Sequence, residues 1–242
     1  MARYFFLSFL FVTSVPGNAQ PDLNIWNELL VEAVSEGVVD YGQWRKNPQF
    51  EQLVAQIATA NTEKMSHKEK LVFYINAYNI LAARGILDNS SPSSVLGRYV
   101  YFKRDKYHVA GTKMNLHELE HALIRPLEEP RIHFAIVCAS QSCPKLRNEA
   151  YTLENLNEQL DLAAHGFIND PLRNYFDVKT GFAKLSKIFE WFEEDFTNQS
   201  TSLQEYLANY TQDPEATALL RQNKFKIKHM KYDWNLNGTL DN

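Results

Sequence analysis

The sequence predicts an α+β protein, a mostly helical single domain with a small, mainly antiparallel sheet. Three observations predict this class. Apolar residues recur at helical spacing in most segments. Strand-like runs are short and scattered, and no repeat or long linker divides the chain. The 242 residues, 45% of them hydrophobic, are enough for one substantial core.

The first 19 residues have the pattern of a secretory signal peptide. Arg3 supplies a positive start, an apolar run follows over residues 4–15, and small residues precede Gln20. The run is too short to span a bilayer, although a buried first helix is an alternative reading. We therefore expect removal of residues 1–19 and a mature domain of residues 20–242 that is periplasmic or secreted. No transmembrane segment is expected after signal removal.

The composition limits the classes of binding partner that we expect. The net charge is −4 and no block of basic residues stands out, so nucleic acid is not an expected partner. The sequence predicts no cofactor. Two cysteines in an exported protein allow one disulfide.

The N-terminal third predicts three helices. They cover residues 22–35, 48–60 and 67–84, with an extended connector at 38–41. Ser66 and Glu69 form a capping box at the start of the third helix, and Gly85 is expected to end it.

Asn76 and Asn79 lie three apart on one side of this third helix. Asparagine is a poor residue for a helix interior, so each side chain needs a specific partner. They either bond neighbouring loops or bind substrate.

The middle of the chain is less regular. Residues 89–97 are rich in turn formers, and residues 99–110 fit two short strands or one hairpin arm. Asn115 is expected to cap a helix over residues 116–124. This helix holds His117, Glu120 and His121, a literal match to the H-x-x-E-H pattern of some metalloproteases. No third ligand is evident, so a solvated charged face is the simpler reading.

The C-terminal half is again regular, with predicted helices and strands in alternation. The pattern predicts helices at 153–168, 186–196, 202–210 and 214–222, a hairpin at 174–185 around Gly181, and a strand at 225–230. Trp44, Trp191 and Trp234 would suit a sugar or peptide groove, although aromatics at helical spacing more often belong to a core.

The stretch from Arg131 to Leu146 is the candidate catalytic segment, because it contains both cysteines and a histidine. Residues 132–137 predict a buried strand and residues 139–142 a tight loop. Cys143-Pro144 then predicts a helix start, where free N–H groups and the helix dipole favour a thiolate.

This arrangement suggests Cys143 as a nucleophile with His133 as its general base. A third group would orient the imidazole, and Glu120, Asp195 and Asn76 are candidates. Backbone N–H groups over residues 142–145 would stabilise an oxyanion, with Ser142 among the substrate-binding residues. A Cys138–Cys143 disulfide is the competing structural reading.

Four motifs resemble the DUF547 domain, a family of uncharacterised function that occurs in exported bacterial proteins and in plant proteins. They are Phe73–Asn79, Leu119–Arg125, Arg131–Pro144 and Leu185–Phe196. The resemblance covers most of residues 38–237, including the tail Tyr232–Asn235. It implies that the following are motif positions: Asn76, Asn79, Glu120, His133, Cys138, Cys143 and Pro144. His117 is not one of them. By analogy, the resemblance also implies a papain- or transglutaminase-like thiol site.

We therefore expect an exported cysteine-dependent hydrolase or acyltransferase. Its site would combine Cys143, His133 and Glu120 with the substrate-binding residues Asn76, Asn79 and Ser142. The substrate would be a peptide, amide or glycan. Two alternatives remain: a non-enzymatic binding or scaffold module with a Cys138–Cys143 disulfide, and a metal-dependent hydrolase.

Overall fold

The computed structural model describes residues 20–240. The predicted signal peptide, residues 1–19, lies outside the described part of the chain. Helices dominate residues 20–240 and the strands are short, which confirms the α+β class and the single domain. No helix in this range is long and apolar enough to cross a membrane.

The helices follow the predicted order with a few differences. The α-helices of residues 20–240 are α1 (Leu23–Ala33), α2 (Pro48–Thr59), α3 (His67–Leu87), α4 (Val95–Tyr99), α5 (Leu116–Glu118), α6 (Leu156–Ile168), α7 (Ile188–Trp191), α8 (Glu193–Thr197), α9 (Leu203–Ala208) and α10 (Pro214–Arg221). Two π-helical turns continue α4 and α5, namely η2 (Val100–Arg104) and η3 (Leu119–Ile124). Three 3-10 helices add η1 (Tyr41–Trp44), η4 (Arg125–Leu127) and η5 (Pro130–Phe134).

The strands form three small sheets instead of one. Their bounds are β1 (Val34–Ser35), β2 (Val38–Asp40), β3 (Tyr107–Val109), β4 (Thr112–Met114), β5 (Tyr175–Asp177), β6 (Phe182–Leu185), β7 (Lys226–His229) and β8 (Gly238–Thr239). Within the described residues, the sheet orders are β1-β2-β8, β3-β4 and β5-β6-β7. The hairpin pairings are antiparallel, whereas β2-β8 and β6-β7 are parallel.

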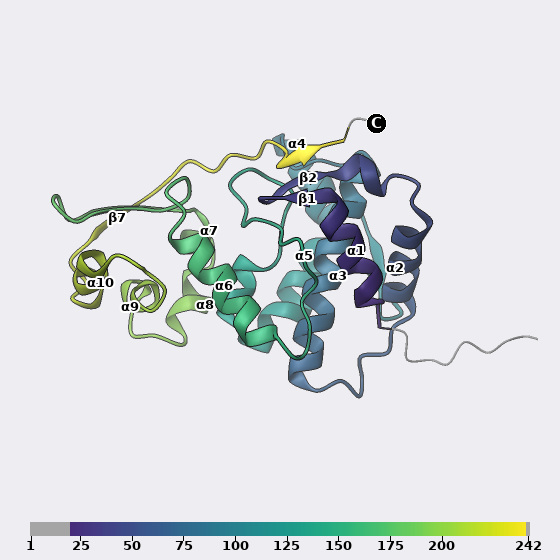
Figure 1. The fold of residues 1–242 in the computed structure, drawn as a ribbon, viewed down its shortest axis with the longest axis horizontal. Coiled ribbons are helices and arrows are strands. Elements are labelled where there is room, and N and C mark those ends of the chain that lie inside the picture. Colours follow the sequence, from purple (N-terminus) through teal and green to yellow (C-terminus); the bar gives the residue numbers. More distant parts are fainter. Residues whose placement is uncertain (1–19, 241–242) are drawn as a thin grey trace, which may run out of the picture.

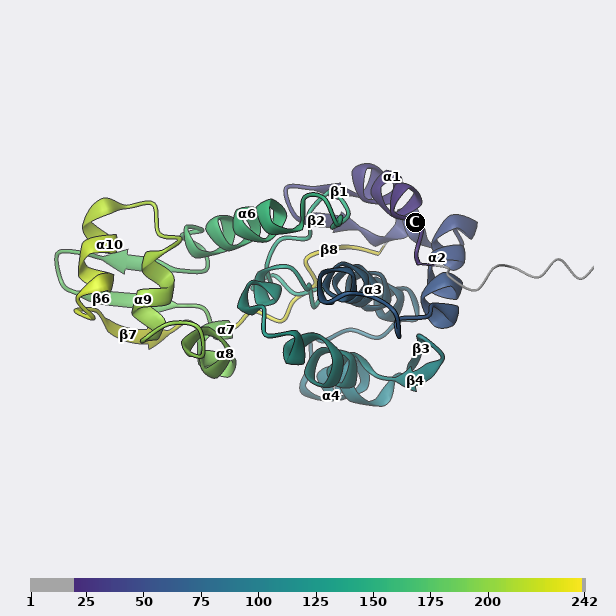
Figure 2. The same ribbon diagram turned by 90° about the horizontal axis from the view of Figure 1, so that it is seen from below.

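Two hydrophobic clusters lie at opposite ends of an elongated molecule (Figure 1). The larger cluster surrounds α3 and includes Trp26 and Tyr78. The smaller one centres on Phe134, Phe189 and other side chains near β6, α9 and α10. Cys138 packs against both clusters. The chain after β7 runs back past this junction to β8, so it links the two ends (Figures 1 and 2).

Helix α3 is the centre of the larger cluster, and its capping box is present as predicted. The helix ends at Leu87, three residues beyond the predicted end. Gly85 therefore lies inside the helix. A Cβ at this position would lie 2.8 Å from Cε2 of Tyr101, so close packing and not helix termination explains this glycine.

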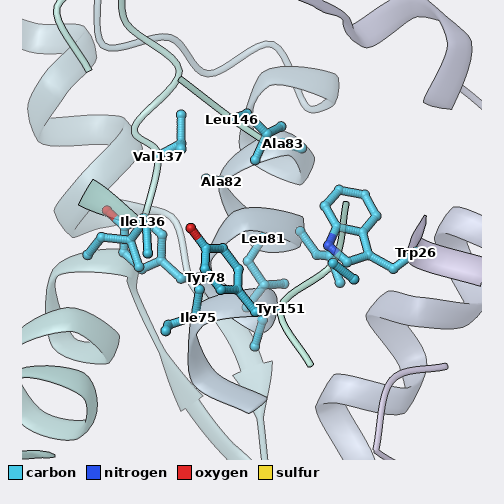
Figure 3. Close-up of a cluster of buried hydrophobic side chains, with 14 of the residues drawn as sticks. Trp26, Ile75, Tyr78, Leu81, Ala82, Ala83, Ile136, Val137, Leu146 and Tyr151 are labelled. Carbon is cyan, nitrogen blue, oxygen red and sulfur yellow. The ribbon is translucent and has the colours of Figure 1, made fainter. Parts of the chain in front are cut away.

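The predicted strand over residues 132–137 is wrong. Residues 130–134 form the 3-10 helix η5, and residues 135–139 are irregular. The side chain of Asn79 takes the place of a neighbouring strand: its Nδ2 donates to the Ala135 carbonyl at 3.0 Å, and its Oδ1 accepts from the Val137 N–H at 2.8 Å. Ile136 and Val137 are buried beside α3 (Figure 3).

The predicted helix at Cys143-Pro144 is also wrong. Residues 144–155 contain no helix, and α6 begins only at Leu156. The preceding loop is tied instead to the C-terminal segment. The N–H groups of Gln141 and Ser142 donate to the carbonyls of Asn235 and Asp233, at 2.8 and 3.1 Å.

The first part of the region predicted as strands, residues 99–104, is helical. Its helix α4 continues into η2, and only the β3-β4 hairpin after it fits the expectation. Helix 116–124 forms as predicted, although its second part, η3, is π-helical.

Candidate functional site

A cavity of about 220 Å³ opens at the junction of the two hydrophobic clusters. Larger cavities of about 450 Å³ lie elsewhere, but this one gathers the reactive side chains. Its ionisable and sulfur-bearing residues are Lys103, His117, Glu120, His121, His133, Cys138, Cys143, Tyr78 and Tyr232. Sites at such junctions often bind small molecules.

His133 is held by Asp195, one of the predicted orienting candidates. The Nε2 atom of His133 lies 2.7 Å from Oδ2 of Asp195. Because the carboxylate only accepts, Nε2 carries the proton and Nδ1 is left free. Arg125 binds Asp195 through two hydrogen bonds of 2.7 Å each. Phe192 stacks on the His133 ring with the centroids 4.0 Å apart.

Burial and hydrogen bonding together set the charge states of Asp195 and His133. Burial raises the pKa of Asp195, but the hydrogen bonds from Arg125 and His133 outweigh it and hold the pKa well below its usual range. Burial lowers the pKa of His133, against the opposing effect of Asp195. At neutral pH the pair is therefore a carboxylate and a neutral imidazole.

Glu120 is a buried carboxyl group on the other side of His133. Its Oε1 lies 4.0 Å from Nδ1 of His133. Burial and the nearby Cys138 raise the pKa of Glu120 to about 8. Glu120 therefore keeps its proton at neutral pH and can donate a hydrogen bond or a proton. Asp195, and not Glu120, orients the imidazole by direct contact.

Cys138 is partly exposed and has three polar neighbours. Its Sγ lies 2.8 Å from Sγ of Cys143, 3.1 Å from Oγ of Ser140 and 3.3 Å from the hydroxyl of Tyr232. Burial raises the pKa of the Cys138 thiol, but these hydrogen bonds outweigh it and lower the pKa below its ordinary value. Cys138 is thus the better placed thiolate.

Cys143 is buried, with 3% of its surface exposed. Burial and the neighbouring Cys138 raise the pKa of its thiol well above the ordinary value. Two contacts act in the other direction. The backbone N–H of Cys138 donates to Sγ of Cys143 at 2.8 Å, and the Tyr232 side chain also lowers the pKa. Burial outweighs both contacts, since they do not replace the lost hydration of a thiolate.

Both cysteines are free thiols. Their separation of 2.8 Å exceeds the roughly 2.05 Å of a disulfide bond. His133 forms no hydrogen bond with either sulfur among the described residues. His133 therefore does not pair directly with either cysteine. Glu120 lies near both His133 and Cys138.

The backbone around Cys138 has an unusual conformation. Ala139 has a φ of 58°, in the left-handed region that non-glycine residues seldom adopt. Its carbonyl accepts a hydrogen bond from the N–H of Asn237 at 3.1 Å, and the hydroxyl of Tyr41 donates to the Asn237 side chain at 2.7 Å. The C-terminal segment therefore holds the cysteine loop in this strained turn.

The three predicted substrate-binding residues lie outside the cavity lining. Asn76 bonds the backbone of Tyr151 through both its amide atoms, and Asn79 holds residues 135 and 137. Ser142 lines a separate cavity, and its hydroxyl accepts from the N–H of Asp233 at 2.9 Å. The N–H groups of Ser142 and Cys143 are engaged by Asp233 and Ser140, so they are not free for the predicted oxyanion contact.

Two π-helical turns place side chains in the cavity. Segment η2 supplies Phe102 and Lys103, while η3 supplies Glu120 and His121. A π-turn inserts an extra residue and rotates the side chains that follow, and it often occurs at functional sites. Sequence periodicity does not reveal such turns.

The tryptophans predicted for a binding groove separate into two groups. Trp191 and Trp234 line the cavity and stack with centroids 5.6 Å apart. Trp44 is fully buried in the larger cluster, 5.3 Å from the ring of Trp26.

The H-x-x-E-H residues lie together, with the rings of His117 and His121 4.1 Å apart. Arg125 donates to Nδ1 of His121 at 2.7 Å. Within residues 20–240, no three His, Cys, Asp or Glu side chains are arranged to hold a metal ion.

A comparison with known protein families matches part of the chain to one family. Residues 62–168 match the family model described as "Protein of unknown function, DUF547". This match supports the resemblance to the DUF547 family over residues 62–168. No curated protein and no solved structure matches it.

The DUF547 match includes both cysteines, Glu120 and His133. It ends before Asp195 and Tyr232, the residues that contact His133 and Cys138. The site therefore joins the matched segment to the C-terminal part of the chain.

Proposed function

We propose that this protein is an exported cysteine-dependent hydrolase or acyltransferase with Cys138 as the nucleophile. The observation that carries the proposal is the hydrogen-bonded sulfur of Cys138 in a cavity with a protonated carboxyl group and a neutral imidazole. Thiolate, acid and base are the groups that acyl transfer requires.

The reaction would have two steps. The sulfur of Cys138 attacks the carbonyl carbon of an ester or amide, and a thioester bond forms. The bond to the leaving group breaks as Glu120 gives it a proton. Water or an amine then attacks the thioester, returns a proton to Glu120 and frees the thiolate.

His133 would serve this proton transfer. Asp195 holds its Nε2–H, so the unprotonated Nδ1 faces Glu120 at 4.0 Å. From there it can accept a proton from Glu120 or from attacking water and return it. Water entering through the open cavity would close the remaining distance.

The test uses p-nitrophenyl acetate as an acyl donor. We expect a burst of p-nitrophenolate and one acetyl group on Cys138 in quenched protein, located by peptide mass spectrometry. Cys138→Ala should abolish both, whereas Cys143→Ala should retain the acetyl group on Cys138. Acetylation of Cys143 instead would restore the assignment based on sequence. No acetylation above that of denatured protein would refute the thiol mechanism.

One observation favours a second function. The sulfurs of Cys138 and Cys143 lie 2.8 Å apart, close enough to bond with small movements of the side chains. A disulfide would fit a periplasmic binding or scaffold module without catalysis. Alkylation of the native protein without reductant discriminates between them, because two alkylated cysteines exclude the bridge and none supports it.

A further inference from the structure

One side of the Cys138 cavity is lined by basic side chains. They are Lys103 from η2, His117 from α5 and His121 from η3. The rings of His117 and His121 lie 4.1 Å apart. Lys103 is exposed and forms no ion pair within residues 20–240.

The cavity has little negative charge to balance this side. Glu120 is the one acidic residue of its described lining, and burial keeps it protonated. Asp195 lies behind His133 and is neutralised by the two hydrogen bonds from Arg125. Glu118, next to His117, pairs with Lys106 at 3.6 Å. Apart from the Cys138 thiolate, the described lining then carries no negative charge, so an anion on this side of the cavity would meet the Lys103 ammonium.

His121 also offers a directed donor. Arg125 has only N–H donors, so Nδ1 of His121 must accept the 2.7 Å hydrogen bond between them. The ring proton is therefore on Nε2, which donates to no protein group among the described hydrogen bonds. Burial, followed by His117 and Arg125, lowers the pKa of His121 to about 4, so the neutral ring persists at pH 7.

Aromatic side chains form another part of the cavity lining. Trp191 stacks on Trp234 with an interplanar angle of 25°, and Phe102 meets Trp234 edge-on. The guanidinium of Arg98 covers Trp234 at 4.8 Å. A volume of about 220 Å³ is small for a ligand site, since such sites usually span roughly 300–1,000 Å³. The cavity therefore suits one residue-sized group.

We propose that the cavity binds an acyl donor that carries a carboxylate, such as an N-acyl amino acid or the C-terminal residue of a peptide. The carboxylate contacts Lys103 and the Nε2–H of His121, and an apolar side group packs against Trp191 and Trp234. Cys138 then faces the acyl carbonyl. This inference rests on the proposed function, because it names the substrate class of the same site.

Binding of two matched probes, N-acetyl-L-phenylalanine and its amide, tests the inference. They differ only in the charge of the terminal group. Titration calorimetry at pH 7 uses the full mature chain with Cys138→Ala, which prevents turnover of either probe. It should show about tenfold tighter binding of the carboxylate, as expected for a charge-assisted hydrogen bond. Lys103→Gln should reduce the preference to less than about threefold.

Lys113→Gln is the matched control, because Lys113 is also exposed but does not line the cavity, and Lys106 stays in place to pair with Glu118. It should keep the preference. Equal affinity for the two probes, no binding of either, or an unchanged preference in Lys103→Gln would overturn the proposal. Because the assay involves no turnover, its result is separate from that of Cys138 acetylation, and either proposal can fail alone.

Discussion

Nε2 of His133 donates to Oδ2 of Asp195 across 2.7 Å, and 62 residues of sequence separate the two. Asp195 belongs to α8, beyond the end of the DUF547 match, while His133 lies inside it. The orientation of the imidazole therefore depends on the C-terminal part of the chain. Arg125 completes the arrangement and keeps Asp195 ionised.

Asp195→Asn should destabilise the protein. The change removes the charged acceptor of Arg125 and His133, and we expect a loss of about 1–3 kcal/mol after allowing for partial exposure. Because the pKa of Asp195 is lowered in the folded state, this stabilisation is present above the unfolded pKa and lost as pH falls through the folded one. Urea denaturation at pH 7 and pH 3 measures the loss.

Glu193→Gln is the control for this change, because Glu193 is an exposed residue of the same helix. Its urea midpoint should match that of the unmodified protein. An Asp195→Asn midpoint that is equally unchanged would show that the His133–Asp195–Arg125 arrangement contributes nothing to stability.

Glu120→Gln should stabilise the protein increasingly as pH rises. In the folded state Glu120 has a pKa of about 8, so between about 4.5 and 8 the unfolded chain is ionised while the folded chain stays protonated. Stability of the unmodified protein therefore falls over this window, by at most about 1.4 kcal/mol per pH unit. Glutamine removes this loss. A stability difference that does not change between pH 5 and pH 8 would contradict the raised pKa.

Asn79→Ala should disturb the cysteine segment as well as the fold. It leaves the Ala135 carbonyl and the Val137 N–H without partners, which costs roughly 2–4 kcal/mol. Asn76→Ala, which frees backbone groups of Tyr151 instead, is the matched comparison. Both should lower the urea midpoint, but only Asn79→Ala should alter the alkylation rate of Cys138. Equal alkylation rates in the two variants would argue against this positioning role.

Tyr232→Phe should raise the pKa of Cys138. The Tyr232 hydroxyl lies 3.3 Å from Sγ of Cys138 and donates to the thiolate in the proposed state. We expect severalfold slower alkylation by iodoacetamide at pH 7 and an unchanged rate at pH 10, where the thiol is ionised in both proteins. The control is Tyr151→Phe, since the buried Tyr151 hydroxyl has no hydrogen-bond partner in the described structure. A slower rate at both pH values would indicate altered access instead of altered acidity.

The regular helices could be predicted because their apolar spacing and caps are local signals. The capping box of Ser66 and Glu69 is an example. The conformation of segment 132–137 could not be predicted in this way. Its backbone groups form hydrogen bonds with Asn79, which lies in a helix 56 residues or more away in sequence. An apolar run indicates that a segment is buried, but it does not indicate which groups form hydrogen bonds with its peptide N–H and C=O groups.

The candidate site could likewise be predicted only in part from the sequence. The sequence motifs brought forward Cys138, Cys143, His133, Glu120 and Asp195, and the structure gathers all five. Which thiol is more acidic depends on Ser140, Tyr232 and the loop that the C-terminal segment holds, and these contacts are long-range. The π-turns that carry Glu120 and Lys103 likewise have no periodic signal.

The acidity of Cys138 is measured most directly by the alkylation rate of each cysteine as a function of pH. Native protein is treated with iodoacetamide under reducing pretreatment, and peptide mass spectrometry follows Cys138 and Cys143 separately. We expect Cys138 to react first, with a rate midpoint below the ordinary thiol pKa of about 8.5, and Cys143 to react at the slow rate of a buried thiol. Faster labelling of Cys143, or labelling of Cys138 only after denaturation, would show that Cys138 is not the reactive thiolate.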